Sequence, residues 1–295
     1  MKGVTEVDVR RGWDDIASWW MSRYNAKGDV NREWVIDPAL LRILGDVRGK
    51  RVLDAGCGTG YLARILARAG ARVDGVDVSE KQLETARAGE AKERLGIRYH
   101  RGDLARLSRF RGGSFDAAVS NVVLQDVLRL REAVREVHRV LSPGGRFVFS
   151  ITHPAFEAPV PGRWVIEPED SERIEDRRGM LVDRYFDRVA VYWGPPGKPL
   201  AVGFHRPLRD YFEALHDAGF VVSRLEEPLP LPEALERFPR NFRDMLRLPN
   251  FLIAEAVKPG RRTRLGKRRV GGGRGVLGSV PRPRPLRDGP AASAP

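Results

Sequence analysis

Short apolar runs alternate with longer amphipathic segments between residues 51 and 152. The apolar runs end in turn residues and predict strands at 51–55, 72–76, 97–101, 115–120 and 146–152. The segments between them carry apolar residues three and four positions apart, which predicts helices at 62–69, 79–94 and 130–141. Strands and helices that alternate at these lengths favour a doubly wound, mostly parallel sheet.

The segments on either side of this region differ in character. Residues 1–48 carry Trp and Leu at helical spacing, which predicts N-terminal helices that form a lid. Residues 154–203 lose the regular pattern. They predict an insertion that covers the carboxyl edge of the sheet, where folds of this kind hold their ligands.

The regular pattern returns in residues 204–258, which form the C-terminal half of the predicted domain. A helix, two strands and a second insertion are expected there, at 207–218, 220–225, 251–257 and 226–249. With the first half at 49–153, the sequence predicts one α/β domain over 1–258. Its fold class is Rossmann-like and doubly wound, with a mostly parallel, seven-stranded sheet.

The positive charge is concentrated at the end of the chain. Of the net charge of +13, residues 259–295 contribute +9, from nine Arg and one Lys against one Asp, which leaves +4 for residues 1–258. This basic tail has too few large apolar side chains to offset the entropy of ordering it. We therefore expect a disordered segment whose binding to polyanions is at most weak and nonspecific.

Composition excludes several classes of site. The single cysteine, Cys57, excludes intramolecular disulfides and thiolate metal clusters, and the five histidines show no metal-ligand spacing. No stretch approaches the roughly 18 apolar residues of a membrane span, and residues 1–11 are charged. We expect a cytoplasmic protein with no membrane partner and no metal site.

The segment VLDAGCGTG, residues 52–60, joins a strand to a helix through three alternate glycines. Glycine is required where φ is positive, or where a ligand approaches the backbone so closely that a Cβ would collide with it. Dinucleotide sites use the spacing G-x-G-x-x-G, whereas the spacing here is G-x-G-x-G and Asp54 lies just upstream. An acid there suits a cationic, amino-acid-bearing ligand, which favours S-adenosylmethionine over NAD.

Two further acids follow the next two predicted strands. Asp77 ends the second strand, where a carboxylate can accept hydrogen bonds from both hydroxyl groups of a ribose. Asp103 follows the third strand, where it could accept from an adenine amino group while Leu104 packs against the base. Either acid alone is a weak signal, but their order and spacing together indicate an adenosine site.

These segments resemble the class I S-adenosylmethionine-dependent methyltransferase superfamily, most strongly over residues 35–152. The resemblance implies that the glycine turn lies against the methionyl portion of the cofactor, that Asp77 binds the ribose and that Asp103 meets the adenine edge. The segment FDAAVSN, residues 115–121, resembles the strand that borders the methyl donor. The implied cofactor contacts are Asp54, Gly56, Cys57, Gly58, Gly60, Asp77, Val78, Asp103, Leu104 and Asn121.

Methyl transfer from a sulfonium is an in-line displacement, so the site must align the acceptor and exclude water. A general base helps if the acceptor is a hydroxyl. The candidates are His153 after the fifth strand, His205 before the next helix, and Asp126, which follows Gln125 after the fourth strand. The alternative for each is a bond to a neighbouring loop or a helix cap.

Aromatic side chains suit a sulfonium and keep water away from it. Candidates for the lid, with packing in a helical core as the alternative, are Trp13, Trp19, Trp20, Tyr24 and Trp34. Candidates for the acceptor pocket are Tyr185, Phe186, Tyr192 and Trp193. Arg206 could pair with an acidic acceptor or with a neighbouring carboxylate.

The expected activity is transfer of a methyl group to oxygen or nitrogen of a small-molecule acceptor. A weaker similarity is to a group of bacterial methyltransferases whose substrates are usually small molecules or are unassigned, and it is carried by residues 28–32, 152–156, 204–208, 218–220 and 226–228. The alternatives are a C-methyltransferase of the quinone-biosynthesis type, an RNA or protein methyltransferase, and a non-catalytic protein that binds the cofactor.

Overall fold

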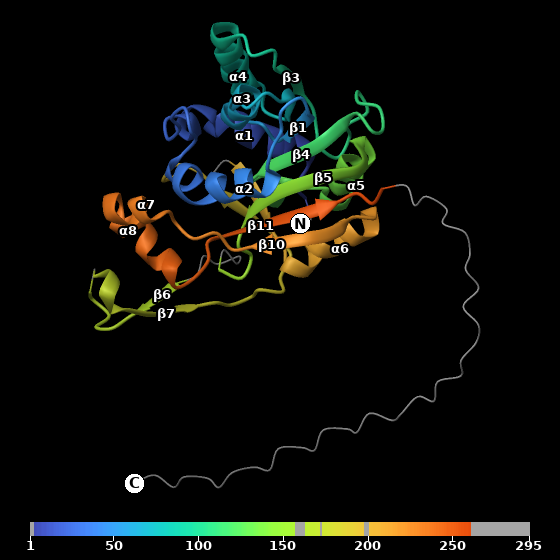
Figure 1. Ribbon diagram of the computed structural model, residues 1–295. Helices are drawn as coiled ribbons and strands as arrows, with labels where there is room; N and C mark the ends of the chain where they lie inside the picture. The colour runs from blue at the N-terminus through green and yellow to red at the C-terminus, as the bar shows by residue number, and fades with distance from the viewer. Residues whose placement is uncertain (1–2, 157–162, 172, 198–200, 261–295) are drawn as a thin grey trace, which may run out of the picture. The chain divides into compact units, whose positions relative to one another are not determined.

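The computed structural model of the protein describes residues 3–156, 163–171, 173–197 and 201–260 (Figure 1). The basic tail expected at 259–295 therefore lies almost wholly outside the described residues. None of the helices in the described residues is long and apolar enough to cross a membrane.

A seven-stranded sheet forms the centre of the domain, in the order β10-β11-β5-β4-β1-β2-β3. The strands are β1 (Arg51–Ala55), β2 (Arg72–Asp77), β3 (Arg98–Arg101), β4 (Phe115–Asn121), β5 (Leu141–Thr152), β10 (Val221–Glu226) and β11 (Phe251–Val257). Strands β1 to β5 pair in parallel, whereas β11 is antiparallel to both β5 and β10. The predicted fold class is confirmed.

One boundary differs clearly from the prediction. Strand β5 begins at Leu141, five residues before the expected start. The residues in between lie outside the strand predicted at 146–152, but Gly144 N donates to Lys258 O at 2.8 Å and Lys258 N donates to Gly145 O at 2.9 Å. Pairing with Phe115 of β4 and with Lys258, directly after β11, therefore lengthens this strand.

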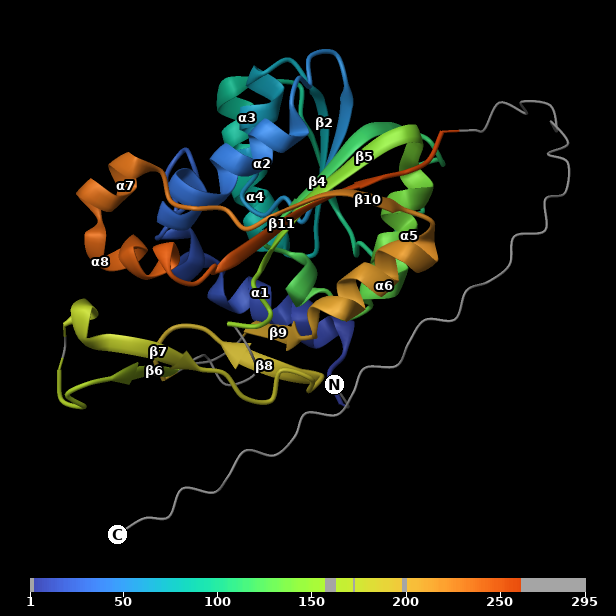
Figure 2. The same ribbon diagram turned by 60° about the horizontal axis from the view of Figure 1, so that its bottom comes forward.

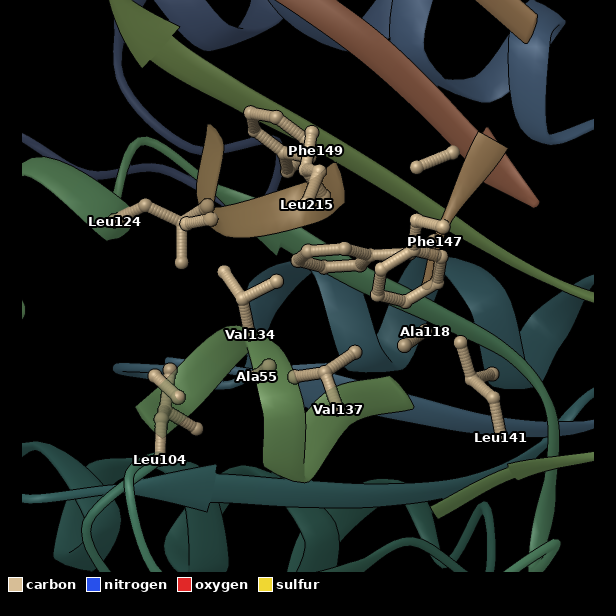
Figure 3. Close-up of a cluster of buried hydrophobic side chains, with 14 of the residues drawn as sticks. Ala55, Leu104, Ala118, Leu124, Val134, Val137, Leu141, Phe147, Phe149 and Leu215 are labelled. Carbon is tan, nitrogen blue, oxygen red and sulfur yellow. The ribbon is translucent and has the colours of Figure 1, made fainter. Parts of the chain in front are cut away.

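Two apolar cores cover the two faces of the sheet, because successive strand residues point to opposite faces. On one face Phe147 and Phe149 pack with Val134 and Val137 of α5 (Leu130–Val140), and with residues of α6 (Leu208–Ala218) (Figure 3). On the other face the alternate residues, such as Val148, pack against α2 (Asp37–Leu44) and α3 (Tyr61–Arg68). These layers fix the strand ends at which the predicted site residues lie.

The N-terminal region begins with helix α1 (Glu6–Met21), whose first turn is closed by a capping box between Thr5 and Asp8. The helix contacts α4 (Glu80–Glu93) and β9 (Ala201–His205), and Figure 2 shows it between these two elements. A π-helical turn, Arg32–Ile36, leads into α2.

The described parts of the two insertions contain regular elements that the sequence did not predict. In the first insertion β6 (Arg163–Ile166) pairs with β7 (Arg177–Leu181), and β8 (Val189–Trp193) pairs with β9, both antiparallel. The second insertion holds two short helices, α7 (Pro232–Arg237) and α8 (Pro239–Phe242).

Candidate active site

A cavity of about 510 Å³ lies at the carboxyl ends of β1, β2, β3 and β4. Its floor comes from the loops that follow these strands, and α1 contributes one of its walls. Nine of the ten predicted cofactor contacts line it: Asp54, Gly56, Cys57, Gly58, Asp77, Val78, Asp103, Leu104 and Asn121. Among the described residues, no group of three or more His, Cys, Asp or Glu side chains gathers in a way that could hold a metal ion.

The glycine turn brings the backbone against the cavity. Gly56 and Gly58 have φ values of +85° and +51°. A Cβ on Gly56 would overlap the side chain of Val123, and one on Gly58 would lie 2.8 Å from Gln82 Oε1. Gly60, the tenth predicted contact, does not line the cavity. The missing Cβ at Gly60 instead makes room for the side chain of Tyr99.

Backbone donors hold the carboxylate of Asp77 at the end of β2. Gly58 N donates to Oδ2 at 2.8 Å, and Ser79 N donates to Oδ1 at 2.9 Å. Burial nevertheless raises the pKa of the Asp77 carboxyl to about 6, although these backbone hydrogen bonds lower it. The group is thus a held, largely ionised acceptor at neutral pH.

Asp103 has a more exposed setting in the loop after β3. Its Oδ1 accepts from Ala105 N at 2.8 Å, and Arg129 Nη2 donates to Oδ2 at 2.7 Å. The neighbouring Leu104 is buried and lines the same part of the cavity. An acidic and an apolar side chain therefore lie next to each other, so that one could accept from the edge of an adenine while the other packs against its face.

Two buried ionisable side chains, Asp54 and Arg32, also line the cavity. Asp54 is buried, and its Oδ2 has no hydrogen-bond partner among the described residues. Burial and the nearby Asp77 raise its pKa to about 7. Arg32 is also buried and pairs with Asp29. Arg32 lies in the segment 28–32 that carries the weaker similarity, but its spacing alone did not predict it as a site residue.

Asn121, at the end of β4, belongs to a buried hydrogen-bond network. Its Nδ2 donates to Asp37 Oδ1 and to Tyr61 Oη, both at 2.7 Å, and Ser150 Oγ donates to its Oδ1 at 2.6 Å. Burial raises the pKa of Asp37 to about 7. The network holds the amide still where β4 meets the cavity.

Asp126 is the one predicted catalytic residue that lines the cavity. It ends a 3-10 turn, Leu124–Asp126, directly after β4. Gln125 Nε2 donates to its Oδ2 at 3.1 Å, and no described residue donates to Oδ1. Burial raises the pKa of Asp126 to about 8, against the lowering effects of Gln125 and Arg206. A buried acid that titrates near neutral pH can take up a proton from an acceptor.

The two predicted catalytic histidines do not line the cavity. His153 Nε2 lies 3.1 Å from Glu227 Oε1, and His153 Nδ1 accepts from Ala155 N at 3.3 Å. Burial lowers the pKa of His153. His205 Nε2 donates to Tyr185 O at 2.8 Å. Both rings contact other segments of the chain at hydrogen-bond distance, and a bond to a loop was the alternative to a catalytic role for each.

Arg206 is likewise buried away from the cavity. Its Nη2 donates to Val127 O at 2.6 Å and to Leu128 O at 3.0 Å. Because Val127 and Leu128 line the cavity, Arg206 supports its wall without lining it.

The predicted aromatic candidates divide into two groups. Trp13, Trp20 and Tyr24 line the cavity. Trp193 of β8 packs against Trp13 and Trp20, with ring centroids 5.1 and 5.4 Å apart, and so supports the wall from behind. The other predicted aromatic residues, none of which lines the cavity, are Trp19, Trp34, Tyr185, Phe186 and Tyr192.

Comparisons with known proteins agree with this geometry. A family model described as a methyltransferase domain matches residues 53–149. An S-adenosylmethionine-dependent methyltransferase from Mesorhizobium loti, of known crystal structure, is 37% identical and superposes with a TM-score of 0.64. The match covers 75% of this chain and 96% of that one.

Curated relatives match a shorter stretch. Ubiquinone biosynthesis O-methyltransferases from Nitrosococcus oceani and Bordetella avium are 33% and 31% identical, each over 45% of this chain and 56% of their own length. The chain thus spans little more than half the length of these relatives. The Mesorhizobium protein is matched along nearly all of its length, and the chain therefore belongs to the S-adenosylmethionine-dependent methyltransferases.

Proposed function

We propose that the protein transfers a methyl group from S-adenosylmethionine to an oxygen or nitrogen atom of a small-molecule acceptor. The observation that carries this proposal is the arrangement of one cavity. At the ends of β1, β2 and β3 lie two glycines that leave no room for a Cβ, the acids Asp77 and Asp103, and an Asp54 oxygen to which no described residue hydrogen-bonds.

The lining residues fit each part of the cofactor. Asp77 would accept from the two ribose hydroxyls, and Asp103 with Leu104 would meet the adenine. The methionyl end carries an ammonium and a carboxylate. The free Oδ2 of Asp54 suits the ammonium, and the buried guanidinium of Arg32 suits the carboxylate.

The acceptor side of the cavity is formed by Asp126, Val127 and the aromatic residues of α1. When bound, S-adenosylmethionine would supply an electrophilic methyl group, which the acceptor attacks in line with the carbon–sulfur bond so that this bond breaks and S-adenosylhomocysteine leaves. Asp126 would hold the acceptor hydroxyl or amine through its free Oδ1 and take up the proton that the acceptor loses. Trp13 and Trp20 would keep water from this end of the cavity.

The names of the curated relatives support oxygen as the methylated atom. They are O-methyltransferases of ubiquinone biosynthesis, so hydroxylated ring compounds are the first acceptors to test. A carbon atom of a ring is the alternative, and the position of the new methyl group in the product separates the two.

The test has two stages. Calorimetry first measures binding of S-adenosylhomocysteine, the product form of the cofactor, which is expected to saturate one site per chain. A metabolite extract is then incubated with the protein and isotope-labelled S-adenosylmethionine, and labelled products are identified by mass. Binding without any labelled product above that of a reaction without the protein would contradict catalysis, and absence of binding would overturn the cofactor assignment.

A further inference from the structure

The start of helix α1 is joined to the predicted adenine acid through one guanidinium. Arg129 Nε lies 2.8 Å from Glu6 Oε1, and Arg129 Nη2 lies 2.7 Å from Asp103 Oδ2. Glu6, Arg129 and Asp103 all line the cavity. A shift of α1 away from the cavity would therefore break the Glu6 pair and free Arg129 from half of its contacts.

A second connection joins the middle of α1 to the predicted ribose acid. Asp14 Oδ1 accepts from Ser79 Oγ at 2.7 Å and from Lys81 N at 3.3 Å. Ser79 caps helix α4, and its backbone N–H donates to Asp77 Oδ1 at 2.9 Å. Ser79 thus contacts Asp14 with its side chain and Asp77 with its backbone.

The part of α1 near these two connections forms a wall of the cavity, through Val9, Arg10 and Trp13 among others. We call the position of α1 in this structure, against α4 and β9, its seated position. A ligand in the cavity would contact the loops that carry Asp77 and Asp103 as well as the seated helix. Such a ligand stabilises the seated position of the helix over any displaced one, by its difference in affinity for the two.

We propose that Arg129 and Asp14 are positioning residues that couple occupancy of the cofactor site to the seating of α1, the helix that walls the acceptor side. This inference rests on the proposed function, because it requires the cofactor in this cavity. Filling the site would then complete the acceptor pocket, and an acceptor would bind best after the cofactor. Figure 2 shows α1 in the seated position, between α4 and β9.

Hydrogen–deuterium exchange of the α1 amides, measured without and with saturating S-adenosylhomocysteine, tests the coupling. The proteins compared are the wild type, Arg129→Gln, Asp14→Asn and a control, Arg131→Gln. Arg131 also makes two ion pairs and is similarly exposed, with 42% of its side chain accessible against 44% for Arg129, but its partners Glu213 and Asp217 belong to α6.

In the wild type and in Arg131→Gln the ligand should slow exchange in α1 by about tenfold or more. In Arg129→Gln and in Asp14→Asn the slowing by the ligand should be about two- to fivefold smaller than in the wild type, because the two connections are partly exposed. Protection of the glycine turn, residues 56–60, should be equal in all four proteins. Arg129→Lys, which keeps a cation, should recover part of the loss.

Equal slowing of α1 in all four proteins would overturn the coupling and leave the cofactor assignment intact. Absence of any protection by the ligand in the wild type, at α1 and at the glycine turn alike, would overturn the proposed function and the coupling with it. The two failures are therefore distinguished within one data set.

Discussion

The carboxylate of Asp126 lies directly against the backbone of Gly203: a Cβ on this glycine would be 2.8 Å from Asp126 Oδ1. The same Cβ would be 3.5 Å from Nε1 of Trp193. Gly203 belongs to β9, so the first insertion supports the cavity by contact with a residue that lines it. A side chain at this position would push the carboxylate from its place.

Gly203→Ala should therefore lower kcat while leaving the affinity for S-adenosylhomocysteine almost unchanged. We expect a loss of about tenfold or more, because a small displacement of a positioned group is costly to the rate. Gly179→Ala is the matched control, since no described atom lies within 4 Å of a Cβ at that position in β7. Equal kcat in the two variants would show that the position of Asp126 does not limit turnover.

The rate should depend on pH through Asp126. The base must be ionised, and burial raises its pKa to about 8. The value of kcat/KM should then rise with pH up to about 8 and level off above it. Asp126→Asn should lower the rate by about 10²- to 10⁴-fold and remove this rise. An unaltered pH–rate profile in the variant would exclude Asp126 as the base.

The same residue should make stability depend on pH in the opposite sense. The folded state binds the Asp126 proton more tightly than the unfolded state, whose pKa is near the ordinary value of 3.8. This contribution is complete below about pH 4 and is lost as the pH rises through about 8. The unfolding free energy of Asp126→Asn, relative to the wild type, should therefore increase between these values. Denaturant titrations across this range measure the difference, and a constant difference would contradict the raised pKa.

The fold could be predicted from the sequence because each central strand has a local sequence signal, an apolar run that ends in turn residues. Val52 and Leu53 lie in an apolar run that stops at a glycine turn, and both faces of the strand are buried. Strand β7 of the first insertion carries no such signal, although β8 (Val189–Trp193) is itself an apolar run. In β7 two arginines and a glycine precede the first large apolar residue, Met180, so neither an apolar run nor an alternation predicts the strand.

The candidate site was predictable only where a strand end decides the position of a residue. Asp77 and Asp103 follow strands of a parallel sheet, so their place at its carboxyl edge follows from the topology. The direction of the His153 side chain depends instead on Glu227, 74 residues later in the chain. Arg32 reaches the cavity through a π-helical turn that no local pattern indicates.

Asp77→Ala should weaken binding of S-adenosylhomocysteine by about 1.5 to 3 kcal/mol, the scale of hydrogen bonds to a charged group. Asp77→Asn, which keeps one acceptor oxygen, should lose less. Calorimetry measures both, with Asp116→Ala as the control, because Asp116 pairs with Arg51 and does not line the cavity. Unchanged affinity in Asp77→Ala would contradict the assignment to the ribose.

The variant Arg32→Gln distinguishes binding at the methionyl end of the cofactor from binding at its adenosine end. If the guanidinium binds the carboxylate, affinity for S-adenosylhomocysteine should fall by about tenfold to a hundredfold, the range for losing a charged hydrogen-bonded pair. Affinity for 5′-methylthioadenosine, which has no carboxylate, should stay the same. Calorimetry with both ligands on one preparation gives the comparison.

The second ligand also controls for the structural part that Arg32 plays. Its side chain pairs with Asp29 and lies beside the rings of Trp20 and Tyr24, at 5.6 and 5.3 Å from their centroids. Its loss could therefore disturb the cavity as a whole. A general disturbance would weaken both ligands by the same factor, whereas loss of a carboxylate contact weakens only the ligand that carries the carboxylate. Equal losses of affinity for the two ligands would show that Arg32 only supports the cavity wall and that it does not bind the methionyl carboxylate.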